Sequence, residues 1–227
     1  MSDRALQEIL IKNSIHSLPL IDQNNRYTRT VYLADLSNKN TPLSIEKTFT
    51  AAVVMAGGEG ARLRPLTDNI PKPMLEINGV PLLERQIRAL AKAGITTIFI
   101  SINYLGHMIQ DYFLDGSNFG VSIYYLLENK KLGTAGALSL LPLLDKNGSL
   151  LVMNGDIFTK SNFLNLYHFH KEHKSSITIS AIEYPVTIPY GVIERNNAKV
   201  IGLKEKPCHR FLCNAGVYAI SLDVIHK

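Results

Sequence analysis

Three glycines and two cations that follow an apolar run form the part of the sequence best suited to binding phosphate. Gly57, Gly58 and Gly60 come directly after residues 51–56, a run typical of a strand buried on both faces. Glycines there let the backbone approach a ligand and direct N–H groups at phosphate oxygens. Arg62 can donate two parallel hydrogen bonds and Lys72 supplies a compact charge, so together they could neutralise a triphosphate during transfer. Read alone, the segment could also be a glycine-rich turn with surface cations.

Two common phosphate-binding motifs are absent from the sequence. It contains no G-x-x-x-x-G-K-[ST], and no G-x-G-x-x-G with a helix and an acidic residue about 20 positions on. Residues 57–67 (G-G-x-G-x-R-L-x-P-L-T) and 71–74 (P-K-P-M) instead resemble the signature of the sugar-1-phosphate nucleotidylyltransferases, of the mannose-1-phosphate guanylyltransferase type. The resemblance implies that Arg62 and Lys72 are catalytic. It also implies nucleotide contacts from Met55, Ala56, Gly57, Gly58 and Gly60.

Two later segments extend the resemblance on the nucleotide side. Residues 132–137 (L-G-T-A-G-A) resemble the second nucleotide-contacting loop of the family, which implies contacts from Gly133 and Thr134; alone, they could simply begin a helix. Asp156 lies just past a predicted strand, where open α/β sheets build their sites. The resemblance implies that Asp156 binds Mg²⁺, which prefers carboxylate and phosphate oxygens. Without the resemblance, Asp156 could equally be an ordinary turn residue.

Three further segments resemble the sugar-phosphate half of such a site. They are P-Y-G-V at 189–192, E-K-P at 205–207 and N-A-G-V-Y at 214–218. By this resemblance Glu205 accepts hydrogen bonds from sugar hydroxyls and Lys206 pairs with the sugar's phosphate. Gly191 and Asn214 line the pocket, and Asn154 belongs to the same group. Each segment alone could be a hairpin turn or a surface ion pair.

The resemblance implies a specific reaction. The phosphate of a sugar 1-phosphate attacks the α-phosphorus of a nucleoside triphosphate (NTP), which gives an NDP-sugar and releases pyrophosphate. The expected substrates are GTP and a hexose or hexosamine 1-phosphate, with Mg²⁺ as cofactor; uridylyl transfer is the close alternative. A binding or regulatory module that keeps the nucleotide loop without turnover, and a phosphosugar- or nucleotide-binding partner protein, are the other interpretations.

The elements that must position these residues follow an alternating pattern. Predicted strands at 51–56, 96–102, 121–127 and 149–153 alternate with predicted helices at 81–94, 106–114 and 134–144. This alternation is the signature of a parallel sheet covered on both faces. We therefore expect a Rossmann-like, mixed but mostly parallel sheet with helices on both faces, the nucleotide-diphospho-sugar transferase fold. Beyond it we expect a helix at 163–173 and strands at 177–181, 191–194, 200–203 and 215–220.

The two ends of the chain differ from the central part. Residues 15–36 resemble the closing strands of a CBS domain, with predicted strands at 18–21 and 27–33, but Arg29 and Tyr32 depart from the CBS pattern. We assign 1–47 to a CBS-domain remnant and linker, and 48–227 to the nucleotidyltransferase domain. The family continues beyond its Asn-Ala-Gly segment to a Trp-x-Asp-x-Gly stretch that supplies a second metal ligand, so we expect 48–227 to lack the C-terminal part of the family domain.

Composition limits the remaining classes. The 227 residues are 46% hydrophobic, enough for a sizeable core, and 24 Lys and Arg against 19 Asp and Glu give a net charge of +5. The cations are too scattered for a nucleic-acid track, and no apolar run reaches the ~18 residues of a membrane span. The two cysteines do not form a convincing metal site, and neither do the three histidines, which lie on one predicted helix. We expect a cytoplasmic protein that binds neither nucleic acid nor membranes, and leave assembly into a homo-oligomer open.

Overall fold

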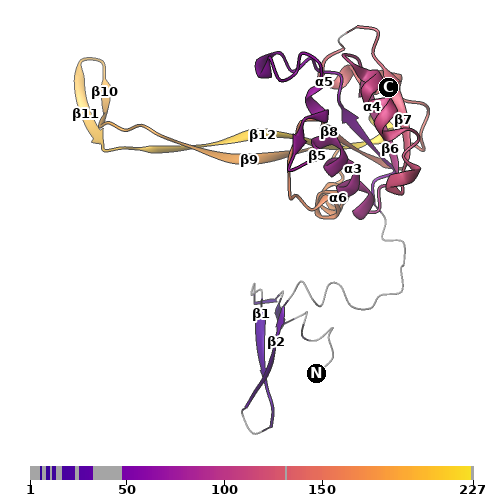
Figure 1. The fold of residues 1–227 in the computed structure, drawn as a ribbon. Helices are drawn as coiled ribbons and strands as arrows, with labels where there is room; N and C mark the ends of the chain where they lie inside the picture. Colours follow the sequence, from indigo (N-terminus) through magenta and orange to yellow (C-terminus); the bar gives the residue numbers. More distant parts are fainter. Residues whose placement is uncertain are drawn as a thin grey trace. The chain divides into compact units, whose positions relative to one another are not determined.

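The computed structural model divides the chain into two compact units, Met1–Lys47 and Thr48–Lys227 (Figure 1). The structure describes residues 6, 9–10, 12–13, 17–23, 26–32, 48–130 and 132–225. In the first unit, β1 (Ser17–Ile21) pairs antiparallel with β2 (Tyr27–Tyr32). Leu6, Leu10 and Val31 form its small buried cluster. The two strands lie where the sequence predicts them, Leu33 lies outside the described residues, and the CBS assignment stays a prediction.

A six-stranded mixed sheet forms the centre of the second unit, in the order β7-β6-β3-β8-β12-β9. The strands β3 (Ala51–Met55), β6 (Thr97–Ile102), β7 (Ser122–Leu127) and β8 (Ser149–Asn154) are parallel to one another. The strands β12 (Cys208–Ser221) and β9 (Ile177–Thr187) complete the sheet in antiparallel pairing. This arrangement confirms the predicted mixed, mostly parallel sheet.

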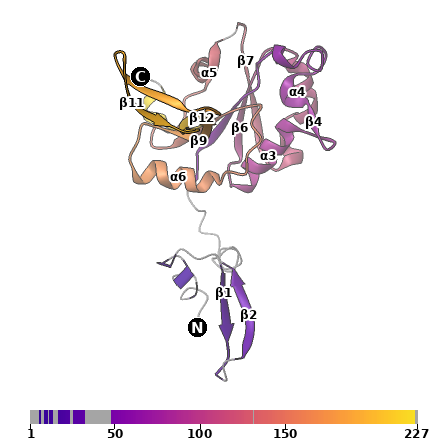
Figure 2. The same ribbon diagram turned by 90° about the vertical axis from the view of Figure 1, so that its left-hand side faces the viewer.

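The strand residues alternate between two cores because successive side chains of a strand point to opposite faces. One face of β3 places Ala52 and Val54 in a large cluster with the helices α3 (Leu82–Lys92), α4 (Gly106–Phe113) and α6 (Phe163–Glu172). The other face places Val53 in a smaller cluster that is covered by short helical turns and loops, including Leu141 and Leu222. Figure 2 shows the arrangement of these helices. Helical segments therefore cover both faces, but the three long helices share one.

The helix that follows β7 is shorter than expected. Instead of one helix over 134–144, the structure has α5 (Gly133–Gly136) and the 3-10 helix η4 (Ala137–Leu140). Leu141 is extended, with φ −67° and ψ 141°, because the proline at position 142 disfavours the helical conformation of the residue before it. The remaining short elements are η1 (Ala61–Leu63), η2 (Lys72–Met74), β4 (Glu76–Ile77), β5 (Val80–Pro81), η3 (Ser117–Phe119) and η5 (Leu222–Val224).

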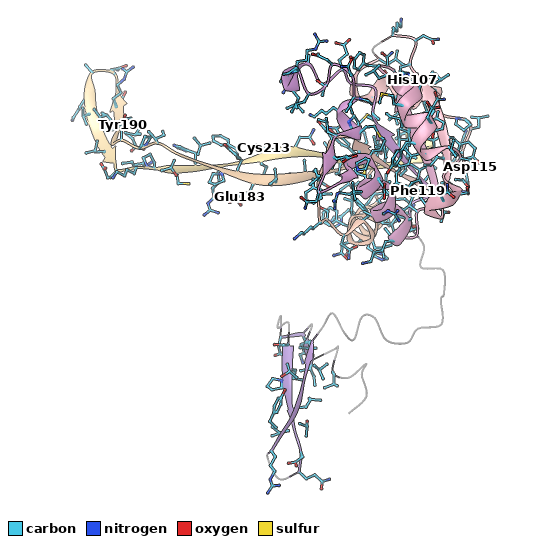
Figure 3. All side chains as sticks on the ribbon, viewed as in Figure 1. His107, Asp115, Phe119, Glu183, Tyr190 and Cys213 are labelled. Atoms are coloured by element: carbon cyan, nitrogen blue, oxygen red, sulfur yellow. The ribbon has the colours of Figure 1, made fainter. Side chains whose placement is uncertain are left out.

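The strands β9 and β12 continue past the sheet as a long two-stranded arm. Their ladder runs from the pair Ala181 and Asn214 to the pair Thr187 and Cys208, and the hairpin of β10 (Val192–Asn196) and β11 (Lys199–Lys204) forms the far end. Both strands are longer than the predicted 177–181 and 215–220 because the two segments satisfy each other's backbone groups. Figure 3 shows Glu183 and Cys213 along the arm and Tyr190 near its end.

Candidate active site

The candidate site lies where the strand order of the sheet reverses. The chain passes from β3 outward through β6 and β7, then returns to β8 on the other side of β3. Open α/β sheets bind ligands at the carboxyl ends of the strands at such a switch point. Met55 at the end of β3 pairs with Asn154 at the end of β8. Gly57 and Asp156 each lie two residues beyond this pair along the chain.

A pocket of about 450 Å³ opens at this edge of the sheet, a size suited to a small ligand. It brings together residues from four separate stretches of the chain, most of them predicted from the sequence. The lining residues are Met55, Ala56, Gly57, Gly58, Arg62, Lys72, Pro73, Glu128, Gly133, Asn154 and Asp156.

Gly60 does not line the pocket but shapes the loop that does. Its φ of +63° lies in the left-handed region, and an added Cβ would lie 3.0 Å from side-chain atoms of both Lys72 and Thr67. The fully buried Thr67 donates its hydroxyl to the Gly60 carbonyl oxygen at 3.0 Å. This packing fixes the loop 57–67 against η2, the 3-10 helix that begins with Lys72. The predicted nucleotide contact of Gly60 stays a prediction.

Lys72 and Asp156 meet in the pocket although 84 residues separate them in sequence. Lys72 Nζ lies 2.5 Å from Asp156 Oδ2, and the two side chains are 34% and 37% exposed. The pair is therefore open to solvent and to a ligand. Arg62 lines the same pocket, so two cations are available to a bound polyanion.

Asp156 sits in a tight turn after β8. The N–H of Gly155 donates to the Met55 carbonyl oxygen at 2.8 Å, and an added Cβ on Gly155 would lie 2.8 Å from that same oxygen. Only glycine lets β3 and the turn approach this closely. The turn therefore depends on a specific residue that the sequence analysis did not assign to the site.

The donor set at Asp156 fits a magnesium ion bound together with substrate. Mg²⁺ commonly takes one or two carboxylates, with phosphate oxygens and water completing its shell. Asp156 offers such a carboxylate at the pocket surface. Within the described residues, no group of three or more His, Cys, Asp or Glu side chains could hold a metal ion by itself. The metal-binding role of Asp156 therefore stays a prediction that requires a phosphate ligand.

Glu128 lines the pocket and was not predicted. Its carboxylate accepts a hydrogen bond from the Ser101 hydroxyl and another from the Leu132 N–H at 3.2 Å, so it braces the start of the 132–137 loop. The signal that identifies Asp156 applies here too, because Glu128 directly follows β7, the outermost parallel strand. Gly133 lines the pocket, and Thr134 follows it in α5.

The predicted sugar-phosphate residues are not all brought to this pocket. Asn154 lines it. Asn214 lies at the base of the arm, where it accepts a hydrogen bond from the Gly216 N–H and donates one to the Tyr218 hydroxyl. Gly191, Glu205 and Lys206 lie at the far end of the arm, next to the β10–β11 hairpin (Figure 1). The structure therefore separates the nucleotide half of the predicted site from most of its sugar half.

His170, one of the three histidines on the predicted helix, is buried and contacts other side chains of the protein. It is 1% exposed, and its ring nitrogens contact the hydroxyls of Thr178 at 2.9 Å and Ser221 at 3.1 Å. It thus joins α6 to the roots of β9 and β12. Burial, with a smaller contribution from the nearby Lys171 charge, lowers the pKa of the His170 imidazole. Cys208 and Cys213 are free and exposed on the arm.

Comparison with known proteins places the chain in a family. Residues 51–227 match the family described as Nucleotidyl transferase, and the chain belongs to that family. This confirms the predicted sugar-1-phosphate nucleotidylyltransferase resemblance at the level of the family.

The similar proteins give the family a more specific character. The chain is 36% identical over 182 residues to the mannose-1-phosphate guanyltransferase of Saccharomyces cerevisiae, covering 76% of this chain and 50% of that protein. It is 32% identical over 181 residues to the mannose-1-phosphate guanylyltransferase of Mycobacterium tuberculosis, covering 78% and 50%. HddC from Yersinia pseudotuberculosis, solved in complex with GMP-PN, superposes with a TM-score of 0.57 at 26% identity and coverages of 78% and 79%. The chain spans about half the length of the curated relatives it matches.

No helix among the described residues is long and apolar enough to cross a membrane.

Proposed function

We propose that this chain binds GTP with Mg²⁺ and transfers its GMP group to mannose 1-phosphate, which yields GDP-mannose and pyrophosphate. The observation that carries the proposal is the convergence of the glycine-rich loop, Arg62, Lys72 and Asp156 in one pocket at the switch point of the sheet. The names of the similar proteins support the choice of guanine and mannose. Two free cysteines suit the reducing cytoplasm that we also propose.

The residues of the pocket would act by positioning and by charge. Gly57 and Gly58 line the pocket and would donate their N–H groups to phosphate oxygens, and Arg62 and Lys72 would neutralise charge as it develops at phosphorus. Asp156 would hold Mg²⁺, which when bound supplies further neutralisation of the phosphates. Because Lys72 pairs with Asp156, binding of metal to that carboxylate would free the Lys72 ammonium for the substrate.

No protein group is needed to deprotonate the nucleophile. A phosphate monoester is largely dianionic at pH 7, because its second pKa is about 6. The pocket accordingly needs to hold two anionic groups in line rather than to remove a proton, and effective alignment alone can lower the barrier by roughly 7–11 kcal/mol. The pocket lining, which includes two cations, three glycines and two carboxylates, matches that requirement.

Pyrophosphate release tests the proposal directly. The four NTPs would be paired with mannose, glucose, glucosamine and N-acetylglucosamine 1-phosphates, first in Mg²⁺ and then in EDTA. Metal-dependent turnover with GTP and mannose 1-phosphate is the expected result. Metal-dependent turnover with UTP instead would replace guanylyl transfer by uridylyl transfer.

A second candidate function is nucleotide binding without turnover. The observation that favours it is the position of Glu205 and Lys206 at the end of the arm, away from the nucleotide pocket. In that case the same assay would give no pyrophosphate, while GTP with Mg²⁺ would still raise the melting temperature by mass action.

A further inference from the structure

Gln86 on α3 holds the turn that carries Asp156. Its Nε2 donates to the carbonyl oxygen of Asn154 at 3.1 Å and to that of Ile157 at 2.6 Å. The two carbonyls lie on either side of Asp156 in sequence. The NH₂ end of the amide must face them, because carbonyl oxygens accept hydrogen bonds and cannot donate. One side chain therefore clamps both ends of the turn.

Gln86 links the turn to a different element from the one that the Gly155 N–H contacts. The Gly155 N–H bonds to Met55 and so ties the turn to β3, while the Ile157 N–H closes the turn on Asn154 at 3.4 Å. Gln86 ties the same turn to α3. With β3 and α3 both part of the core, the two attachments hold the backbone of the turn from which the Asp156 side chain extends.

Gln86 occupies a position where an apolar side chain would be expected. It is 4% exposed and lies on the core-facing side of α3, beside Leu83 and Ile87. Its Oε1 is buried and has no hydrogen-bond partner among the described residues. Burying an amide oxygen in this way costs stability. The two bonds to the turn are what the amide provides in return.

We propose that Gln86 is a positioning residue for metal binding: by clamping the 154–157 turn it presents the Asp156 carboxylate to the pocket. The proposal rests on the proposed function, because it takes Asp156 as the Mg²⁺ ligand. Residues that orient a metal ligand in this way typically change metal affinity or activity about 10- to 100-fold when they are replaced.

The test compares Gln86→Met, which removes both donors and keeps a similar length, with the control Ile87→Val in the adjacent core position of α3. The melting temperature of each protein would be followed with GTP while Mg²⁺ is titrated, and with GTP in EDTA. For Gln86→Met we expect the Mg²⁺ midpoint to rise about 10-fold or more, with the response to GTP in EDTA unchanged. Ile87→Val should lower the melting temperature without moving the Mg²⁺ midpoint.

The possible outcomes separate the two hypotheses. A wild-type Mg²⁺ midpoint in folded Gln86→Met would overturn the role of Gln86 while leaving the proposed function standing. Absence of any Mg²⁺-dependent gain with GTP in the wild-type protein would refute the proposed function, and the role of Gln86 with it. If Gln86→Met does not fold, the same titration on Gln86→Glu, which keeps the side-chain length, decides: an unchanged midpoint overturns the proposal.

Discussion

Replacing Lys72 by methionine should separate catalysis from stability. The substitution keeps the length of the side chain and removes its charge. The Lys72–Asp156 pair is 34% and 37% exposed, so its loss should cost the fold no more than about 1 kcal/mol, the usual range for solvent-open ion pairs. Loss of one group that stabilises charge in the transition state typically lowers kcat by about 10²–10³, or roughly 3–4 kcal/mol. Turnover should therefore fall far more than stability.

The assay measures pyrophosphate release at saturating GTP, mannose 1-phosphate and Mg²⁺, alongside thermal unfolding of the same samples. Lys92→Met, an exposed lysine at the end of α3, serves as the control and should behave as wild type in both. GTP affinity should weaken less than kcat falls, because Arg62 and the glycine-rich loop remain. A folded Lys72→Met protein with kcat within a few-fold of wild type would refute the assigned role of Lys72.

Three further predictions concern other parts of the second unit. Gly155→Ala should destabilise the protein by about 1–3 kcal/mol and abolish GTP binding, because its Cβ would lie 2.8 Å from the Met55 carbonyl oxygen; urea unfolding and calorimetry measure the two effects. The pKa of His170 in the folded protein is lowered below its usual value of 6.5, so the unfolded chain takes up the proton first as the pH falls through 6.5. The free energy of unfolding should therefore drop by no more than about 1.4 kcal/mol per pH unit, down to the lowered pKa. Urea midpoints at pH 7.5 and 5.5 should show this loss in the wild type and not in His170→Gln. Limited proteolysis should cut within 181–214 before the sheet, since a two-stranded ribbon is only marginally stable; first cuts in β3 or β8 would contradict this.

The sequence predicted the part of the fold that local patterns determine. Strands β3, β6 and β8 are buried on both faces, so each appears as a short, mainly apolar run ended by polar or turn residues, whereas β7 lies at the edge of the sheet and alternates between exposed and buried residues. The site residues at the ends of β3 and β8 could be predicted for the same reason, because chemistry at such a sheet gathers where strands end. The family resemblance added their roles, which the runs themselves do not contain.

What the sequence did not predict depends on contacts between distant residues. The arm is one case: its strands extend because residues 181–187 and 208–214 pair with each other, and neither segment alone shows that partner. Gln86 is another, because a glutamine in an amphipathic helix gives no sign of the turn it binds 68 residues away. Pro142 is the contrary example, since the rule that shortens the preceding helix is local and could have been applied to the sequence.

The position of the arm leads to a last prediction about how the two halves of the site meet. Six residue steps separate the Ala181–Asn214 pair from the Thr187–Cys208 pair, which is roughly 20 Å of ribbon before the hairpin near Glu205 begins. Transfer requires the reacting atoms within about 3.5 Å, so a sugar phosphate held by Glu205 and Lys206 could react only if the arm changes direction.

The ladder is interrupted at one place near the base of the arm, the register shift between Asn214 and Tyr218, where Gly216 has a φ of +70°. A bulge with glycine in the left-handed region is where a strand can bend with least strain. In a protein carrying Cys213→Ser and Lys92→Cys, the distance between labels on Cys208 and on position 92 should change when GTP, Mg²⁺ and mannose 1-phosphate are added together. An unchanged distance in a protein that turns over would show that Glu205 and Lys206 do not bind the sugar phosphate that reacts in the nucleotide pocket of the same chain.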